Sequence, residues 1–221
     1  DISSKVVNRN PSGPFTTSTL QQTASSRLGF GASRTMQIAQ KLYQGIEIDG
    51  ETIGLITYMR TDGTNLSKDA VSNFREYIKK EIGNEYLPND ALNYSGKKAK
   101  NAQEAHEAIR PTDIIRTPQS VKKYLSPDQV KLYDLIWSRA LSSQMESAKF
   151  DRNTITISSD NNDTICKASG SVLKFDGFLK IYNNTNKDDN ENILPAMTKG
   201  LVNIEALLDE QHFTQPPPRY S

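Results

Sequence analysis

The chain has 221 residues, of which 35% are hydrophobic and 24% are charged, and its formal net charge is +1. This balance is that of an ordinary folded protein and excludes a disordered chain. No apolar run approaches the roughly 20 residues that a membrane-spanning helix needs, and no secretory signal peptide follows the N-terminus. The single cysteine, Cys166, excludes an internal disulfide and a zinc site of several thiolates. We therefore expect a cytoplasmic protein without a membrane partner.

The charge of the chain is unevenly distributed. Its first 46 residues carry five basic side chains against one acidic side chain. A local basic face can bind a phosphate backbone even when the total charge is near zero. The near-neutral balance therefore does not exclude nucleic acid as a partner, although a solvated helix face would explain the same pattern.

Two helices are predicted within the first 45 residues. The first follows Thr16 and ends at Gly29, because glycine suits the left-handed conformation at a helix C-terminus. Its inward face is predicted to hold Leu20, Ala24 and Leu28. The second begins at Ser33 as N-cap and ends at Gly45. Its inward residues are predicted to be Met36, Ala39, Leu42 and Tyr43.

A β-hairpin is predicted next, in the stretch IEIDGETIGLITYMRT. Asp49-Gly50 is typical of a two-residue turn between β-rich arms. The second arm contains Tyr58 and Arg60, which alternation along a strand would place on one face. A tyrosine hydroxyl has a pKa of about 10, so a nucleophilic tyrosine needs a neighbour that favours its phenolate. Arg60 could do this and also bind a phosphate oxygen, but this pattern alone is weak, since a strand tyrosine is usually a residue of the core or of its rim.

Two further helix starts are marked by their caps. Ser67 is the predicted N-cap of one helix, and Ser126 begins another with a capping box and a proline at the first helical position. The inward face of the second is predicted to hold Val130, Tyr133, Trp137, Ala140 and Leu141. We interpret Trp137 as a core residue and not as a surface on which bases stack.

After about Lys149 the hydrophobic period changes from that of a helix to that of a strand. Residues 154–158 alternate, and so do residues 202–208. Residues 175–178 fit a turn between strands. Cys166 is predicted to be a buried or half-buried strand residue.

Together these patterns predict an α+β fold. A mainly helical domain at residues 14–146 would be inserted into a β-rich domain made of residues 1–13 and 147–221. The chain begins without a methionine and stops after QPPPRYS, so we expect a fragment of a longer protein.

Several longer motifs resemble one family. They are PFTTSTLQQTASSRLGFGASRTMQIAQKLYQ, GLITYMRTDGTNLS, QEAHEAIRPTD, KLYDLIWSRALSSQM, LKFDGF and QHFTQPPPRYS. They occur in the order found in the bacterial type IA DNA topoisomerase family, and the match runs from about Pro14 to Ser221. The chain resembles a central fragment of such an enzyme. The GIEIDGETI stretch is longer than the family pattern, which puts the hairpin tip in doubt but not the motif.

The resemblance implies a function and a set of site residues. Tyr58 would form a transient 5′-phosphotyrosyl bond to a single DNA strand, and Arg60 would contact the DNA. His106 and Arg110, in the EAHEAIRP motif, would belong to the DNA-binding site. The helical catalytic domain and the β-rich arch would be parts of a toroid. The partners would be single-stranded and negatively supercoiled DNA in the bacterial nucleoid, and the protein would act as a monomer.

The resemblance also bears on cofactors. Transesterification conserves the phosphodiester energy, and the chain has no GxxxxGK[ST] nucleotide loop. The family's acidic DxDxD cluster is absent, so we expect Mg²⁺ in the full-length enzyme, no cofactor within this fragment, and a fragment that is inactive alone. His106 to Arg110 imitates a zinc HExxH helix, but Arg110 replaces the second histidine, which argues against zinc.

Two other functions stay open. A tyrosine-recombinase-like enzyme is suggested by Tyr58, Arg60, His106 and Arg110, but their order and spacing differ from that pattern. A non-catalytic DNA-binding module would use the helices and the hairpin only for binding, and replacement of Tyr58 by phenylalanine would separate it from an enzyme.

Overall fold

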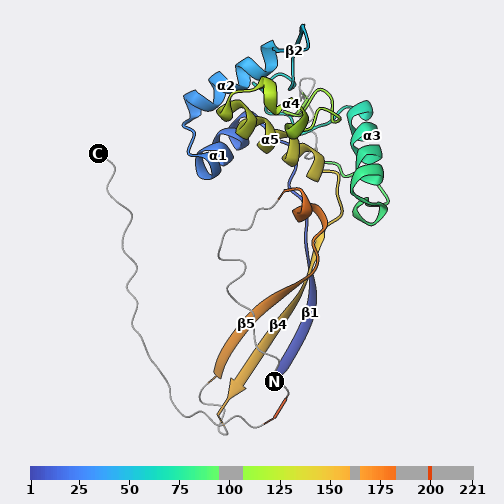
Figure 1. Cartoon of the computed structure of the whole chain (residues 1–221). Helices are drawn as coiled ribbons and strands as arrows, with labels where there is room; N and C mark the ends of the chain where they lie inside the picture. Colours follow the sequence, from blue (N-terminus) through green and yellow to red (C-terminus); the bar gives the residue numbers. More distant parts are fainter. Residues whose placement is uncertain (95–106, 160–164, 183–198, 201–221) are drawn as a thin grey trace, which may run out of the picture.

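The computed structural model describes residues 1–94, 107–159, 165–182 and 199–200. A group of helices lies at one end of a long, narrow sheet (Figure 1). The helices are α1 (Thr17–Leu28), α2 (Ala32–Gln44), α3 (Lys68–Tyr77), α4 (Pro118–Val121) and α5 (Pro127–Ser142). The strands are β1 (Ile2–Arg9), β2 (Ile46–Ile48), β3 (Glu51–Ile53), β4 (Ala148–Ser158) and β5 (Ile165–Phe175). Short π or 3₁₀ turns are η1 (Ile78–Ile82), η2 (Asn84–Tyr86), η3 (Lys122–Tyr124) and η4 (Gly177–Lys180).

The long sheet joins distant parts of the chain. Its order is β1-β4-β5 and both pairings are antiparallel, so β1 at the N-terminus lies against the strand that follows α5. The opposed pairs run from Ile2↔Ile155 to Arg9↔Ala148. The helices are thus enclosed in the sequence between β1 and β4. The predicted α+β class is confirmed, while the division at residues 14 and 146 stays a prediction.

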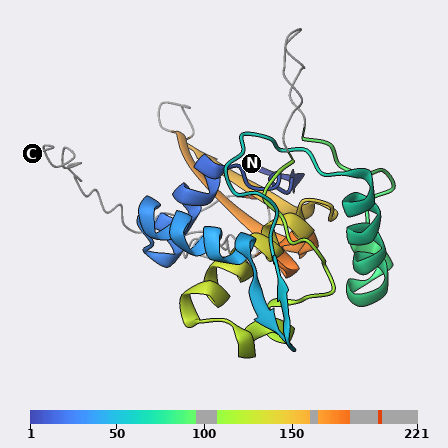
Figure 2. The ribbon, with the colours of Figure 1, turned by 90° about the horizontal axis from the view of Figure 1, so that it is seen from above.

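The helical part has two sides around a common core. Figure 2 shows α1 and α2 on one side and α3 on the other. Helix α5 contributes the fully buried Tyr133, whose hydroxyl donates to the Arg116 carbonyl at 2.7 Å, and the buried Trp137, whose indole donates to the Ile114 carbonyl at 3.0 Å. Trp137 is a core residue, as its helical spacing predicted.

Most predicted helix ends are confirmed by their caps. The Ser126 side chain accepts a hydrogen bond from the Gln129 amide, and the Gln129 side chain accepts one from the Ser126 amide, which completes a capping box. The Ser67 side chain accepts from the Ala70 amide at the start of α3. Thr16 caps α1, and Gly29 ends it at φ 67°. The predicted start of α2 is wrong by two residues, because its N-cap is Gly31 and not Ser33.

The inward face of α2 also differs from the prediction. Its buried residues are Thr35, Ile38, Ala39 and Leu42. Tyr43 lies at the margin of that stripe and is 40% exposed. Its ring contacts the ring of Tyr58, as described below.

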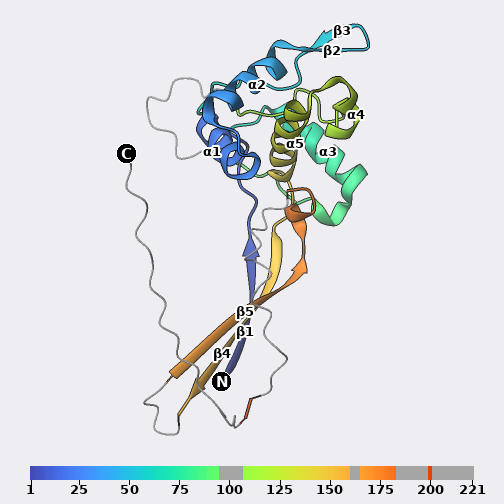
Figure 3. The same ribbon diagram turned by 60° about the vertical axis from the view of Figure 1, so that its left-hand side comes forward.

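The hairpin prediction is confirmed at its tip and wrong in its second arm. Strands β2 and β3 pair across Asp49 and Gly50, which have φ values of 51° and 90°, as a mirror-image turn requires. The hairpin projects beyond the end of α2 (Figure 3). Its second strand ends at Ile53, however, so Tyr58 and Arg60 do not lie on a strand. Strand alternation therefore does not place them on one face.

Two further expectations are wrong, and two others lie outside the described residues. Cys166 is a strand residue but is exposed, not buried. Residues 175–178 do not turn into another strand, because η4 follows β5 directly. His106 and residues 202–208 lie outside the described residues.

Candidate active site around Tyr58

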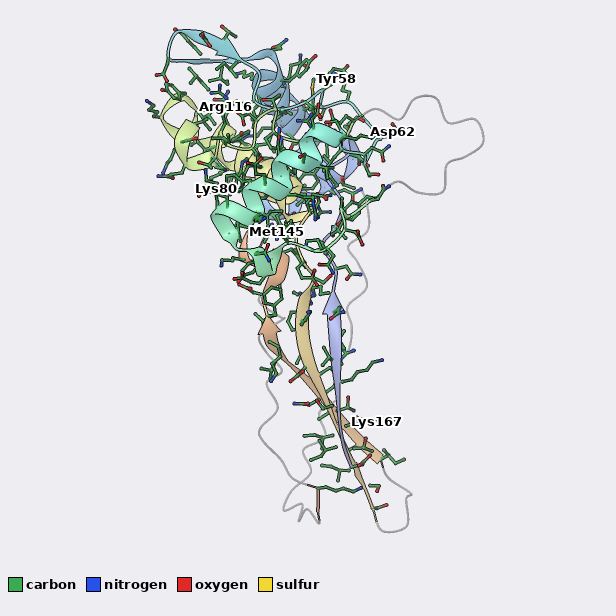
Figure 4. All side chains as sticks on the ribbon, turned by 90° about the vertical axis from the view of Figure 1, so that its right-hand side faces the viewer. Tyr58, Asp62, Lys80, Arg116, Met145 and Lys167 are labelled. Atoms are coloured by element: carbon green, nitrogen blue, oxygen red, sulfur yellow. The ribbon has the colours of Figure 1, made fainter. Side chains whose placement is uncertain are left out.

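Tyr58 is presented on an irregular segment, residues 54–63, which we call the Tyr58 segment. The Tyr58 side chain is 48% exposed, whereas Ile56 and Met59 on either side of it are 1% exposed. Figure 4 shows Tyr58 at one end of the molecule, on the helical part, and Lys167 at the other end, on the long sheet. Burial of its neighbours thus fixes the segment to the core while the phenol faces solvent.

The upstream half of the Tyr58 segment is held by residues 108–112. The Thr57 amide donates to the Arg110 carbonyl at 2.9 Å, and the Thr57 hydroxyl donates to the Ala108 carbonyl at 2.7 Å. The same hydroxyl accepts from the Arg110 amide at 3.0 Å. Three hydrogen bonds therefore fix the residue directly before Tyr58.

Helix α2 holds the same half from another direction. The Leu55 amide donates to the Leu42 carbonyl at 2.8 Å, and the Thr112 amide donates to the Leu55 carbonyl at 3.0 Å. The ring of Tyr43, in the last turn of α2, contacts the ring of Tyr58 with centroids 5.4 Å apart. Tyr58 is thereby supported by the backbone bonds of Leu55, three residues upstream, and by its own ring contact.

The downstream half is held by the first residue of α1. The Thr17 hydroxyl donates to the Met59 carbonyl at 2.8 Å and accepts from the Thr61 amide at 2.8 Å. The Thr17 amide donates to the Thr61 carbonyl at 2.8 Å. These contacts hold the residues directly before and after Arg60, so the start of α1 determines where the backbone of Arg60 lies.

Arg60 lines an open depression of about 510 Å³ at the N-terminus of α1. Its lining residues are Thr16, Thr17, Ser18, Arg60, Thr61 and Asp62. The first turn of α1 carries no acidic residue, and Asp62 is the one acidic residue among those lining the depression. A guanidinium and a helix N-terminus at one depression suit an anion such as a phosphate. Tyr58 lies outside that lining, two residues from Arg60.

Arg110 is engaged within the protein. Its Nε and Nη2 donate to the two carboxylate oxygens of Glu107 at 2.7 and 3.0 Å, and its Nη1 donates to the Pro111 carbonyl at 2.9 Å. Glu107 in turn accepts from the Ser67 amide at 2.8 Å, at the start of α3. The role of Arg110 that this geometry supports is to hold two segments together, and its contact with DNA stays a prediction.

The electrostatics of Glu107 follow from this pair. Partial burial raises the pKa of its carboxyl group, but hydrogen bonds from Arg110 and from the Ser67 amide oppose burial and hold the pKa below its ordinary value. Glu107 is therefore a charged structural partner and not a proton donor near neutral pH.

Residues 107–110 form no helix. Ile109 pairs with Phe15 and Glu107 pairs with Asn65 through isolated bridges. The segment is extended because its hydrogen bonds go to distant parts of the chain.

Within the residues described, no group of three His, Cys, Asp or Glu side chains could hold a metal ion. In the same residues, no helix is long and apolar enough to cross a membrane.

Three residues of the site were not found from the sequence. Thr17 bonds to the Tyr58 segment from α1, Thr57 ties that segment to Ala108, and the ring of Tyr43 contacts the ring of Tyr58. Threonine at the start of a helix or next to a tyrosine gives no signal of such a contact. The resemblance to the PFTTSTLQQ motif was the only indication that the start of α1 mattered.

An exposed tyrosine on a rigidly held segment, beside an arginine at a helix N-terminus, defines a site suited to phosphodiester chemistry. A family model described as DNA topoisomerase matches residues 1–221. Since this match covers the whole sequence, the chain belongs to that family, and the resemblance seen in its motifs is confirmed.

Individual relatives agree with the family. The DNA topoisomerase 1 of Rickettsia felis (strain ATCC VR-1525 / URRWXCal2) is 49% identical over 224 residues, covering 100% of this chain and 29% of that protein. That of Xylella fastidiosa (strain 9a5c) is 48% identical over 229 residues, with 100% and 28% covered. The solved structure of full-length topoisomerase I from Thermotoga maritima matches with a TM-score of 0.75 and 38% identity, covering 89% of this chain and 31% of that chain. The chain therefore spans less than a third of the length of these relatives.

Proposed function

We propose that the full-length protein is a type IA DNA topoisomerase in which Tyr58 cuts one DNA strand, lets another strand pass, and reseals the break. The observation that carries this proposal is the exposed Tyr58 side chain on a segment held from both directions. A nucleophile on a fixed backbone reaches the phosphate with less loss of freedom than one on a loose loop. Relaxation of negatively supercoiled DNA without ATP would be the net result.

The chemical step is a transfer of the phosphodiester. The Tyr58 oxygen, having lost its proton, bonds to phosphorus, and the bond from phosphorus to the 3′-oxygen of the DNA breaks. The leaving 3′-oxygen gains a proton, and the DNA beyond the cut stays on Tyr58 as a 5′-phosphotyrosyl ester. Resealing reverses each of these changes, so no nucleotide is consumed. Arg60 would offset the charge that develops on the phosphate oxygens.

The remaining partners belong to the same proposal. His106 and Arg110 would contact the DNA strand, which would be single-stranded at the site, and the enzyme would act as a monomer in the bacterial cytoplasm. Magnesium, which the resemblance implies for the full-length enzyme, finds no ligand cluster among the residues that the structure describes. No step above passes through it.

The test is covalent capture of DNA by the full-length protein. A single-stranded oligonucleotide labelled at its 3′ end should become attached to the wild-type protein, because the 5′-phosphotyrosyl fragment keeps that end. Tyr58→Phe should abolish the attachment. Tyr124→Phe is the matched control, since it removes another hydroxyl of the helical part, one that bonds to Asp49 at the hairpin tip.

The same experiment separates the other functions. A DNA-binding module would form no covalent complex, and Tyr58→Phe would leave all activity of the protein intact. A covalent complex that retains only a 5′ label would contradict the 5′-phosphotyrosyl linkage.

A further inference from the structure

One hydroxyl group bridges the two peptide groups on either side of Arg60. The Thr17 hydroxyl donates to the Met59 carbonyl, which belongs to the peptide before Arg60, and accepts from the Thr61 amide, which belongs to the peptide after it. Both distances are 2.8 Å. Because φ and ψ describe how these two peptide planes are turned about Cα, a single side chain restrains both backbone angles of Arg60.

The surrounding contacts make this bridge rigid. The Thr17 amide donates to the Thr61 carbonyl at 2.8 Å, so the two residues are joined through backbone as well as side chain. Thr61 is 7% exposed, and its own hydroxyl accepts from the Gly63 amide at 3.0 Å. Met59 is 1% exposed. Arg60 is thus an exposed residue between two buried neighbours, both bonded to Thr17.

Helix α1 does not need the Thr17 hydroxyl for its own stability. The N-cap is Thr16, whose side chain accepts from the Thr19 amide at 3.3 Å, and the Thr19 hydroxyl accepts from the Thr16 amide at 2.9 Å. Thr17 is the first helical residue and is not part of the capping box formed by Thr16 and Thr19. Its hydroxyl serves residues more than 40 positions away in the sequence.

We propose that Thr17 is a positioning residue for the cleavage reaction: it fixes the backbone of Arg60 so that the guanidinium stands at the depression beside Tyr58. This inference rests on the proposed function. A charge-assisted contact to phosphate depends on the place and direction of the guanidinium fork. Without the bridge, Arg60 would keep its charge but would have to be ordered each time DNA binds.

The test compares variants of the full-length enzyme by the rate of covalent-complex formation at saturating single-stranded DNA. Thr17→Val keeps the shape of the side chain and removes the hydroxyl. We expect it to slow the reaction on the order of tenfold, because small displacements of a positioned group are costly. Thr17→Ser keeps the hydroxyl and should stay within about twofold of wild type. If Thr17→Val fails to fold, Thr17→Ala replaces it in the test, because the smaller side chain leaves space for a water molecule to bond to the Thr61 amide.

Two controls separate positioning from general damage. Thr35 is fully buried in α2, and its hydroxyl donates to the Gly31 carbonyl at 3.1 Å, so Thr35→Val makes the same chemical change away from the site. It should lower the thermal midpoint without slowing cleavage. In an Arg60→Ala background, Thr17→Val should add less than about a twofold loss, because residues that act through one another are not additive.

Several results would overturn the inference. These are a wild-type rate for Thr17→Val, a loss for Thr17→Ser as large as that for Thr17→Val, full additivity with Arg60→Ala, or a wild-type rate for Arg60→Ala itself. In each case a covalent complex that still requires Tyr58 would leave the proposed function standing. A covalent complex formed by Tyr58→Phe would instead refute the proposed function.

Discussion

The ring of Tyr43 contacts the ring of Tyr58 edge to face, with centroids 5.4 Å apart and planes inclined by 67°. Both rings are close to half exposed, so this contact lies on the surface and not in the core. Since Tyr43 comes from the last turn of α2, the helix helps to decide the direction in which the Tyr58 phenol points.

Replacement of Tyr43 by leucine in the full-length enzyme should slow covalent-complex formation. An aromatic pair is worth about 0.5–1.5 kcal/mol, so we expect a loss of roughly two- to tenfold. Tyr43→Phe keeps the ring and should restore most of the rate. The measurement is the single-turnover rate on a labelled oligonucleotide at saturating DNA. If DNA affinity alone fell and the saturated rate did not, Tyr43 would be a DNA contact and not a support for Tyr58.

Gly54 should tolerate no side chain, because α2 lies too close to it. A Cβ at Gly54 would lie 2.7 Å from the Tyr43 carbonyl oxygen, which is backbone and cannot rotate away. Gly54→Ala should cost about 1–3 kcal/mol of stability and should also slow cleavage, since the Tyr58 segment would have to move. Thermal unfolding and covalent-complex yield measure the two effects.

Gly31 provides the comparison for Gly54. No atom lies within 4 Å of a Cβ added at Gly31, which is the N-cap of α2 and has a negative φ. Gly31→Ala should cost no more than about 1 kcal/mol, the loss of a favourable N-cap residue, with cleavage unchanged. Equal costs for the two variants would show that α2 and the Tyr58 segment can separate freely.

The Glu107–Arg110 pair should make stability depend on acid. The pKa of Glu107 is lower in the folded protein than its ordinary 4.5, so the folded state binds fewer protons than the unfolded state around that pH. The stabilisation is therefore present in full above the ordinary pKa and is lost as the pH falls through the lower, folded value. The thermal midpoint of Glu107→Gln should change less between pH 6 and about pH 3 than that of wild type. Parallel midpoint curves for the two proteins would contradict this account.

Local signals were sufficient for the helix ends and the hairpin tip. Ser126, Ser67 and Gly29 act on amides and carbonyls within a few residues, so their patterns can be interpreted without the rest of the fold. The Asp49–Gly50 turn is equally local. These features were predicted because the atoms that decide them are close together in the sequence.

The Tyr58 segment could not be predicted in this way. Its partners are residues 108–112, Thr17 and the end of α2, and an isolated bridge between Ile56 and Pro111 takes the place of a strand ladder. A β-rich composition was therefore mistaken for a strand. Cys166 failed for a related reason: alternation shows that a strand has two faces but not which face is covered, and most of β5 is exposed in the described part of the chain.

Arg60 should matter far more to cleavage and resealing than to folding. It is exposed at the depression beside α1, and its neighbours Met59 and Thr61, not its own side chain, fix the segment to the core. Removal of one charge-stabilising donor from an active site costs on the order of 100- to 1,000-fold in rate. Arg60→Ala in the full-length enzyme should show a loss of that order with a nearly unchanged thermal midpoint. Arg60→Lys should recover only part of the rate, because an ammonium cannot reproduce the planar fork.

The matched control for Arg60 is another exposed arginine of the helical part. Arg34 pairs with Asp128 and its side chain is 55% exposed, so Arg34→Ala removes the same charge from a surface ion pair. Such pairs contribute about 0–1 kcal/mol to folding, and cleavage should be unaffected. The measurements are covalent-complex yield, the rate of resealing after salt is added, and thermal unfolding. Normal cleavage and resealing by Arg60→Ala would remove Arg60 from the active site, and Tyr58 would then need another cationic partner, with His106 the first to replace.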